Sequence, residues 1–207
     1  MSNIFYIVRH GQSEGNVNDD ITGQNPPLTK RGLEQAEKLA QIFASIKLDQ
    51  VFSSNMVRAQ QTAKTIALSK NLDHQQNPLI RERFFGSLEG LPGSEIKANY
   101  QKKLDEFDQL DLVEQMKWRI VDNMESYEEV LIRVLPFFEI FNQQKQNQHI
   151  LLVTHANVIL ALLIHFGFAQ SFSQLPYGSI KNTGYIKVEQ KANKFEITEL
   201  LGISKIE

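Results

Sequence analysis

The chain has 207 residues, 42% of them hydrophobic, and a formal net charge of −2 at pH 7. This length and composition are typical of one globular domain with a full core, so residues 1–207 are expected to form a single domain. The small net charge gives no basic field for nucleic acid, and the lack of cysteine excludes disulfides and thiolate catalysis. No signal-peptide pattern precedes Arg9 and no apolar run is long enough to span a membrane, so we expect a cytoplasmic protein without a membrane partner.

The first predicted strand, residues 4–8, is apolar and rich in β-branched and aromatic side chains, which is typical of a strand buried on both faces. Residues 11–27 contain Gly, Asn, Asp and Pro without a period, which indicates a loop. Thr29 then caps a helix whose apolar residues recur at helical spacing. A short second strand is predicted at residues 51–53, and a second helix at about 55–68.

A short third strand is predicted at residues 79–80. The irregular segment of residues 86–123 is expected to form one or two helices inserted as a cap above the sheet. The sequence Ser126–Glu129 matches a capping box and predicts a long helix that ends near residue 144. A buried strand at 149–154 and an apolar helix at 158–166 follow.

The last two strands are predicted at residues 184–189 and 195–200, close enough in sequence to form a hairpin. The earlier strands are separated by helices, which favours parallel βαβ units. We therefore predict a three-layer α/β/α sandwich with a mixed, mainly parallel central sheet.

Four cationic or imidazole side chains follow predicted strands directly or begin the next helix. Arg9 and His10 follow the first strand, Arg58 lies in the first turn after the second, and His155 follows the strand at 149–154. In a parallel sheet these positions converge at one edge, where ligands bind. Each residue alone is weak support, since a single Arg or His is more often structural. Together they predict a pocket for an anion, with phosphate as the leading candidate.

The same residues carry a family resemblance. Arg9–Asn16 (RHGQSEGN), Ser53–Ala63 (SSNMVRAQQTA), Arg81–Gly90 (RERFFGSLEG) and Val153–Asn157 (VTHAN) resemble, in order, four motifs of the histidine phosphatase superfamily, in its phosphoglycerate mutase-like branch. An RHG tripeptide alone is a weak match, whereas four motifs in family order are specific. The resemblance covers residues 4 to about 160 and implies a phosphoglycerate mutase-like fold.

The resemblance also implies catalytic roles. His10 matches the nucleophile, because neutral imidazole attacks phosphorus through Nε2 when Nδ1 keeps its proton. Glu82 matches the general acid that protonates the leaving alkoxide and then activates water. Arg9, Arg58 and His155 match the groups that neutralise the phosphoryl oxygens. With these cations present no metal or other cofactor is required, and the chain shows no metal-ligand spacing.

Five further positions match family residues that contact phosphate or substrate: Ser13, Asn16, Thr22, Gly23 and Ala156. Read from spacing alone, the first four are equally well ordinary loop residues. Ala156 stands where many relatives have Gly, although its backbone N–H remains a donor. Glu14 and Glu89 are alternative acidic groups that rank below Glu82.

The family contains phosphatases and cofactor-dependent phosphoglycerate mutases. Mutases resembling this chain have a lysine shortly after the Glu-Gly segment and a tandem arginine farther on. Residues 91–93 contain no lysine, Arg119 stands alone, and the 86–123 segment is short for a mutase lid. These differences favour a phosphatase that acts on small phosphorylated metabolites. A mutase is the alternative, and a non-catalytic phosphate-binding module is a further one, although that module would be expected to lack His10 or Glu82. The sequence predicts no oligomeric state.

Overall fold

The computed structural model describes residues 2–21, 25–143, 147–191 and 194–206, without the side chains of 142 and 143. Within these residues one sheet of six strands has the order β3-β2-β4-β1-β5-β6. The strands are β1 (Asn3–Arg9), β2 (Gln50–Ser53), β3 (His74–Gln76), β4 (His149–Thr154), β5 (Ile180–Lys191) and β6 (Lys194–Ile203). Strands β3, β2, β4 and β1 are parallel, and β5 and β6 are antiparallel additions. This confirms the predicted mixed, mainly parallel sheet.

Strand β1 lies inside the sheet, paired in parallel with β4 and antiparallel with β5. Its side chains alternate between two separate cores, as the two-residue period of a strand requires. Phe5 and Ile7 belong to one core and Tyr6 and Val8 to the other, and all four are nearly inaccessible. The continuous apolar run therefore reflects a strand covered on both faces.

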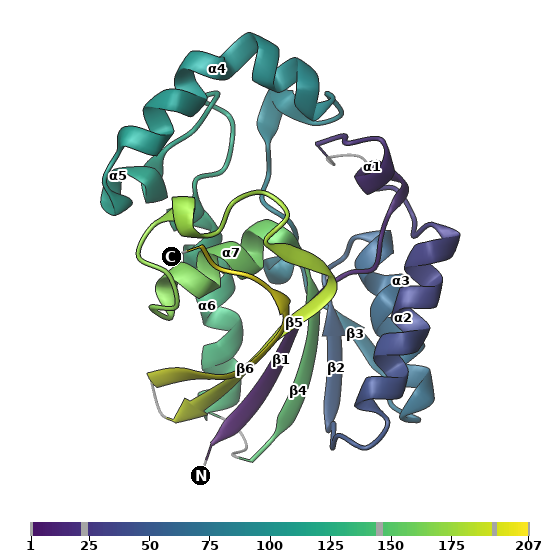
Figure 1. Cartoon of the computed structure of the whole chain (residues 1–207). Coiled ribbons are helices and arrows are strands. Elements are labelled where there is room, and N and C mark those ends of the chain that lie inside the picture. Colours follow the sequence, from purple (N-terminus) through teal and green to yellow (C-terminus); the bar gives the residue numbers. More distant parts are fainter. Residues whose placement is uncertain (1, 22–24, 144–146, 192–193, 207) are drawn as a thin grey trace.

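Helices cover both faces of the sheet, which gives the three layers visible in Figure 1. Helices α2 (Lys30–Phe43) and α3 (Val57–Ser69) pack on one face, and α6 (Tyr127–Gln143) and α7 (Ala156–His165) pack on the other. Both predicted helix caps are confirmed. The Thr29 side chain accepts a hydrogen bond from Gly32 N, and Ser126 and Glu129 form the reciprocal capping box.

Two predictions of local structure are wrong. Residues 79–80 are part of a 3₁₀ helix, η1 (Pro78–Ile80), because Pro78 lacks an N–H and Asn77 caps the turn by accepting from Leu79 N. The third strand lies earlier, at β3. The predicted loop of residues 11–27 contains a one-turn helix, α1 (Glu14–Val17), held by its own capping box.

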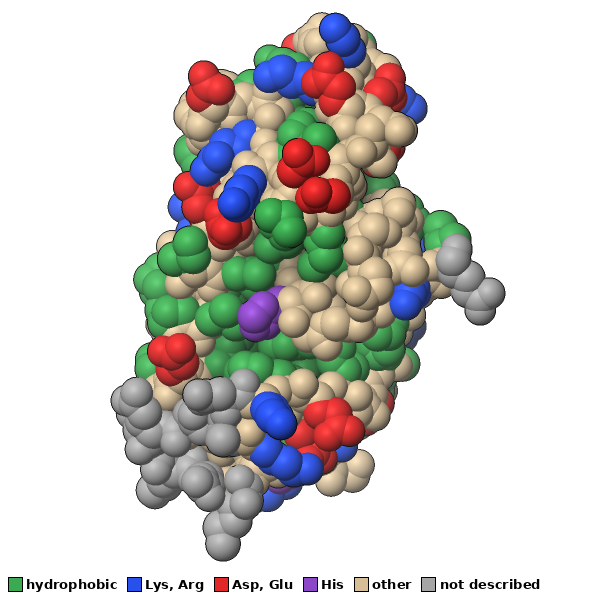
Figure 2. All heavy atoms as spheres, turned by 90° about the vertical axis from the view of Figure 1, so that its left-hand side faces the viewer, with side chains coloured by type: hydrophobic (Ala, Val, Ile, Leu, Met, Phe, Trp, Pro, Cys, Tyr) green, Lys and Arg blue, Asp and Glu red, His purple; other side chains and the backbone are tan. Residues whose placement is uncertain are grey.

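Residues 86–124 lie above the carboxyl ends of the parallel strands and are called the cap below (Figure 1). The cap contains η2 (Gly86–Leu88), α4 (Gly93–Gln109) and α5 (Leu112–Lys117). It has a small core of its own, made by Leu88, Ile96, Ile120 and Met124. Figure 2 shows charged side chains gathered over the cap and hydrophobic ones across the middle of the same face.

None of the helices in the described ranges is long and apolar enough to cross a membrane. The remaining element is a 3₁₀ helix, η3 (Phe172–Gln174), in the segment that leads from α7 to β5. This segment lies at the same end of the sheet as the cap (Figure 1).

Candidate active site

His10 lies directly after β1, at the carboxyl edge of the sheet, and is almost fully buried. Its Nδ1 is 2.6 Å from the carbonyl oxygen of Gly11, and its Nε2 is 3.1 Å from Nε of Arg58. A carbonyl only accepts, and a guanidinium only donates. The proton therefore lies on Nδ1, and the lone pair of Nε2 faces Arg58.

The surroundings of His10 keep its ring neutral. Burial lowers the pKa of His10 well below its ordinary value, and the charges of Arg58 and Arg9 lower the pKa further. The hydrogen bond to Gly11 opposes this shift without reversing it. At neutral pH the ring is thus an uncharged imidazole with an available Nε2 lone pair, which is the form that acts as a nucleophile.

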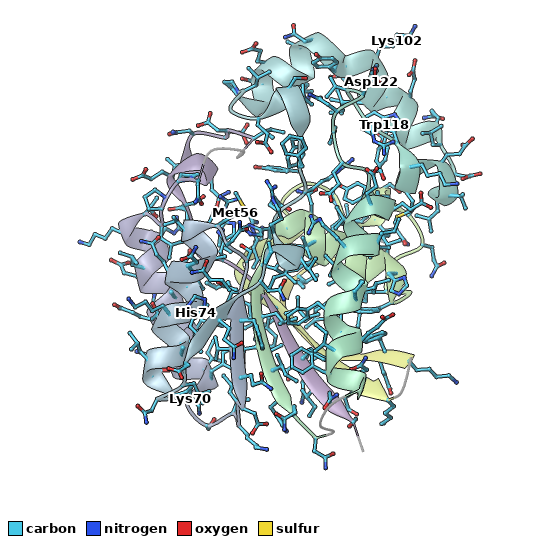
Figure 3. All side chains as sticks on the ribbon, turned by 180° about the vertical axis from the view of Figure 1, so that it is seen from behind. Met56, Lys70, His74, Lys102, Trp118 and Asp122 are labelled. Carbon is cyan, nitrogen blue, oxygen red and sulfur yellow. The ribbon has the colours of Figure 1, made fainter. Side chains whose placement is uncertain are left out.

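Arg58 is fully buried at the start of α3, and its Nη2 donates to Sδ of Met56 at 3.3 Å. Figure 3 shows Met56 at the end of the sheet that faces the cap. Burial lowers the pKa of Arg58 to about 10, while the charge of Glu82 raises it. The guanidinium therefore remains charged at neutral pH.

Arg9 supplies a second cation to the same edge. Its Nη1 donates to the carbonyl oxygen of Ile180, and its buried Nε has no hydrogen-bond partner among the described residues. Burial lowers the pKa of Arg9, and the nearby Glu82 carboxyl opposes that effect. A buried N–H donor without a partner is costly, so this atom is ready to bind an anionic oxygen.

His155 is the N-cap residue of α7 and faces His10, with the two ring centroids 5.1 Å apart. Its Nε2 is 2.6 Å from Oγ of Ser54, which itself accepts from Met56 N. When the Ser54 hydroxyl donates its proton to Nε2, the proton of His155 lies on Nδ1. That Nδ1 is buried and has no partner within the described residues. In that tautomer Nδ1 is a second donor for an anion.

Glu82 is the carboxyl group of this site. Burial raises the pKa of Glu82 above its ordinary value, although Arg58 and Arg9 lower it in part. Its Oε1 accepts from Arg83 N at 2.9 Å, and the side chain of Asn157 is a second hydrogen-bond partner. A raised pKa keeps a larger fraction of this carboxyl protonated near neutral pH, as a general acid requires.

Two contacts hold Glu82 above the end of β4. The hydroxyl of Thr154 donates to the carbonyl oxygen of Ile80 at 2.7 Å and fixes the segment that precedes Glu82. The hydroxyl of Tyr127 donates to Oδ1 of Asn157 at 2.9 Å, which turns the Asn157 amide nitrogen toward Glu82. These partners come from β4, α6 and α7, so three elements determine the position of one carboxyl.

The five secondary residues are placed differently. Asn16 and Ala156 line the cavity described below. Ser13 is fully buried and its Oγ accepts from Asn16 N, so its hydroxyl takes part in the cap of α1. Thr22 and Gly23 lie outside the described residues.

Close backbone packing fixes the loop that carries His10. A Cβ on Gly11 would lie 2.5 Å from the carbonyl oxygen of Gly32, and one on Gly32 would lie 2.0 Å from that of Gln12. The hydroxyl of Thr62 accepts from Gly11 N and donates to the carbonyl oxygen of Arg58. Glycine at both positions thus lets α2 approach the loop, and Thr62 connects the loop to α3.

A cavity of about 910 Å³ opens beside these residues and begins at Arg9. Its walls come from the loop after β1, from α4, from the starts of α6 and α7, and from residues 172–182. Asn182 belongs to this wall and donates to the carbonyl oxygen of His10 and to Oδ1 of Asn16.

Residues 172–182 were not predicted as part of the site, because they precede the last hairpin in an irregular segment without a motif. Ser54 and Asn157 were also given no role, although each lies inside one of the four family motifs.

The arrangement can bind and transfer a phosphoryl group. The neutral imidazole of His10, two guanidinium groups, a second imidazole and a protonatable carboxyl lie near one another. No group of three or more His, Asp or Glu side chains suited to a metal ion occurs in the part of the chain that the structure describes.

Comparison with known proteins gives a family and two relatives of different activity. The model of the histidine phosphatase superfamily (branch 1) matches residues 5–201. The adenosylcobalamin/alpha-ribazole phosphatase of Escherichia coli (strain K12) is 30% identical over 164 residues, which cover 77% of this chain and 76% of that protein. A 2,3-bisphosphoglycerate-dependent phosphoglycerate mutase of Cytophaga hutchinsonii is also 30% identical, over 167 residues that cover 78% of this chain and 76% of the mutase.

The fold is likewise similar to solved structures. A mycobacterial glucosyl-3-phosphoglycerate phosphatase in complex with VO3 superposes with a TM-score of 0.84 at 21% identity, covering 97% of this chain and 99% of the other. At this identity the likeness concerns the fold. It extends over the cap as well as the sheet, because nearly all of both chains are aligned.

Proposed function

The chain belongs to branch 1 of the histidine phosphatase superfamily, and from this premise we propose that it is a metal-independent phosphatase of small phosphorylated metabolites. One observation carries the proposal: beside the neutral His10, the buried Nε of Arg9 and Nδ1 of His155 have no hydrogen-bond partner among the described residues. With the guanidinium of Arg58 they form a cradle for the three non-bridging oxygens of a phosphoryl group.

In the first step Nε2 of His10 attacks phosphorus, and the bond from phosphorus to the leaving oxygen breaks. The carboxyl of Glu82 gives its proton to that oxygen, so the leaving group departs as a neutral alcohol. Arg58 contacts Nε2 in the structure, so the incoming phosphoryl group takes this guanidinium as a partner for its own oxygens. The product is a phosphohistidine with its positive ring held by Gly11 through Nδ1.

In the second step water attacks phosphorus and the bond to Nε2 breaks. The Glu82 carboxylate takes the proton from water, which returns it to the acid form, and inorganic phosphate leaves. The two arginines and His155 lower the barrier in both steps by binding the same oxygens. The chain's own residues thus supply the charge neutralisation, and the proposed steps include no metal.

The cavity supports a phosphatase more than a mutase. A mutase holds a second anionic group of its substrate, and that role requires further permanent cations. Among the described residues that line the cavity, the cations are Arg9 and Lys181, and Asp108 adds a negative charge. Lys181 is exposed, so its charge is screened by solvent.

The test is phosphate release from p-nitrophenyl phosphate in excess chelator by the wild type and by His10→Ala. We expect turnover in the wild type and a loss of more than about a thousandfold in the variant, as for other nucleophile removals. His165→Ala is the matched control, because His165 is exposed at the end of α7. Full activity of His10→Ala would contradict the proposal.

A second measurement separates the alternatives. Incubation with 3-phosphoglycerate and a bisphosphoglycerate primer is expected to release inorganic phosphate. Formation of an isomeric phosphoglycerate in its place would show a mutase. If neither substrate reacts while phosphate binds, the chain is a non-catalytic binding module.

A further inference from the structure

The cavity lined by Arg9, Asn16 and Asn157 adjoins the candidate site and is where we place the leaving group of a substrate. It begins at Arg9 and extends between α4 and residues 172–182, away from the sheet. Its volume of about 910 Å³ is near the upper end of the range for small-molecule sites, roughly 300–1,000 Å³. It is therefore much larger than a phosphate or a three-carbon phosphate ester requires.

The walls of the cavity are mainly apolar. Seven aromatic or leucine side chains line it: Leu104, Phe107, Tyr127, Leu160, Phe172, Leu175 and Tyr177. Three of the rings form one cluster, with centroids 5.6 Å apart for Phe107 and Phe172 and 4.4 Å apart for Tyr127 and Phe172. Because these rings come from α4, α6 and η3, the cap and the body of the protein both contribute to the apolar wall.

The charges of the cavity do not suit a second anionic group. Arg9 is assigned to the phosphoryl group, which leaves Lys181 and Asp108 as the charged lining residues among those described. These two carry opposite charges and are both exposed, so together they provide no net positive field. A substrate with a carboxylate or a second phosphate gains little here, whereas an uncharged apolar group removes water from the aromatic wall.

On the basis of the proposed function, we propose that the substrates are phosphate monoesters of uncharged alcohols that carry an aromatic or similarly large apolar ring. The ring packs among Phe107, Tyr127 and Phe172, and the phosphoryl group lies between Arg9 and His10. Edge-to-face and offset contacts with these rings add to the burial of apolar area. The class is defined by the chemistry of the leaving group, and the phosphoryl transfer itself is unchanged.

Two pairs of ligands test this inference. The first is 3-phenylpropylphosphonate against propylphosphonate, which differ by the ring and cannot be hydrolysed. Calorimetric titration is expected to show about tenfold to a hundredfold tighter binding of the phenyl compound, the range for burying one large apolar group. The second comparison is 3-phosphonopropionate, which is expected to bind no more tightly than propylphosphonate.

Two variants test whether the apolar wall of the cavity causes the preference for the phenyl compound. Leu160→Asn places an amide in the apolar wall and is expected to reduce the preference for the phenyl compound to less than about threefold. Ile132→Asn is the matched control, because Ile132 is 66% exposed on α6 and does not line the cavity. Equal binding of the first pair by the wild type, or tighter binding of 3-phosphonopropionate, would overturn the inference.

The corresponding phosphate esters separate this inference from the proposed function. Hydrolysis of both 3-phenylpropyl and propyl phosphate without the binding preference would leave the phosphatase standing and reject the substrate class. A binding preference without hydrolysis of either ester would support the ligand class and reject the phosphatase. Both outcomes are read from the wild type, so they do not depend on whether a variant folds.

Discussion

His10 and His155 illustrate how single residues respond to burial. Both rings are inaccessible, and burial followed by the charge of Arg58 lowers the pKa of each well below its ordinary value. The folded protein therefore keeps both rings neutral at pH values where the unfolded chain protonates them. Burial therefore accounts both for the neutral form of these two rings and for their effect on the stability of the fold.

A dependence of stability on pH follows from these two shifts. As the pH falls below about 6.5, the unfolded chain takes up protons that the folded protein does not, so the free energy of unfolding decreases. Each such histidine contributes at most about 1.4 kcal/mol per pH unit. Urea unfolding at about pH 7.5 and 5.5 measures the decrease.

The variant His155→Asn isolates one of the two contributions. Its free energy of unfolding should fall less than that of the wild type between the two pH values. The raised pKa of Glu82 acts with the opposite sign, since its contribution to stability is lost as pH rises through that pKa. Because Glu82 is present in both proteins, the difference between them reports His155. An equal pH dependence would contradict a neutral, buried His155.

Ser54 is predicted to act through the tautomer of His155. Its Oγ lies 2.6 Å from Nε2 of His155, and we expect the hydroxyl to donate to this nitrogen and so to keep the ring proton on Nδ1. Ser54→Ala removes the hydrogen bond to Nε2 of His155. We expect kcat to fall about tenfold with little change in KM, because a tenfold change in rate corresponds to the free energy of one net hydrogen bond. Nitrogen-15 spectra of the histidines should show the Nδ1–H tautomer in the wild type and a mixture in the variant.

The control for Ser54→Ala is Ser69→Ala, which removes a serine hydroxyl at the exposed end of α3. This change is expected to leave both kcat and the histidine spectra unaltered. If the spectra of Ser54→Ala keep a single Nδ1–H tautomer, the positioning role of Ser54 is wrong even if the activity falls.

At the level of elements, the approach of α2 to the loop after β1 decides where His10 lies. Replacing a helical Gly by Ala ordinarily stabilises a helix by about 1 kcal/mol. In Gly32→Ala the new Cβ would lie 2.0 Å from the carbonyl oxygen of Gln12, so the backbone must move. The clash outweighs the helix propensity, and we expect a loss of about 1–3 kcal/mol in the free energy of unfolding.

A substitution at a solvent-exposed position of α2 is the control for the steric clash expected in Gly32→Ala. Glu37→Ala changes an exposed residue of the same helix and should alter stability by less than about 0.5 kcal/mol. Chemical denaturation of Gly32→Ala, Glu37→Ala and the wild type gives both values. A more stable Gly32→Ala would show that the loop and α2 are less closely packed than the structure indicates.

For the whole molecule, the central sheet and the cap differ in the fraction of their residues that are buried. Strand β4 buries five of its six residues, whereas α4 buries one of seventeen, Ile96. Regions with few buried contacts open locally at lower free energy than the core. Amide hydrogen exchange in the wild type is therefore expected to be faster in α4 and α5 than in β1 and β4, and equal protection of both regions would contradict this difference.

The sequence by itself determined five of the six strands of the described sheet, most of the helices and the residues expected at the carboxyl edge of the sheet. The reason is local. Strand periodicity and the capping residues Thr29 and Ser126 act within a few positions, Arg9 ends β1, and His10 and His155 directly follow strands. The structure then brings His10, Arg58 and His155 together, because parallel strands end at the same edge. The family followed from the order of the four motifs.

Only the tertiary structure decided the shape and chemistry of the cavity. Its wall combines α4 with residues 172–182, which are distant in sequence and share no pattern. The same is true of the contacts that set proton positions, such as Ser54 with His155 and Asn157 with Glu82, since each joins residues from different elements. Strand β3 and η1 were misplaced because Asn77 and Pro78 favour a capped turn where apolar residues suggested a strand. Contacts between distant segments depend on packing, which local patterns do not record.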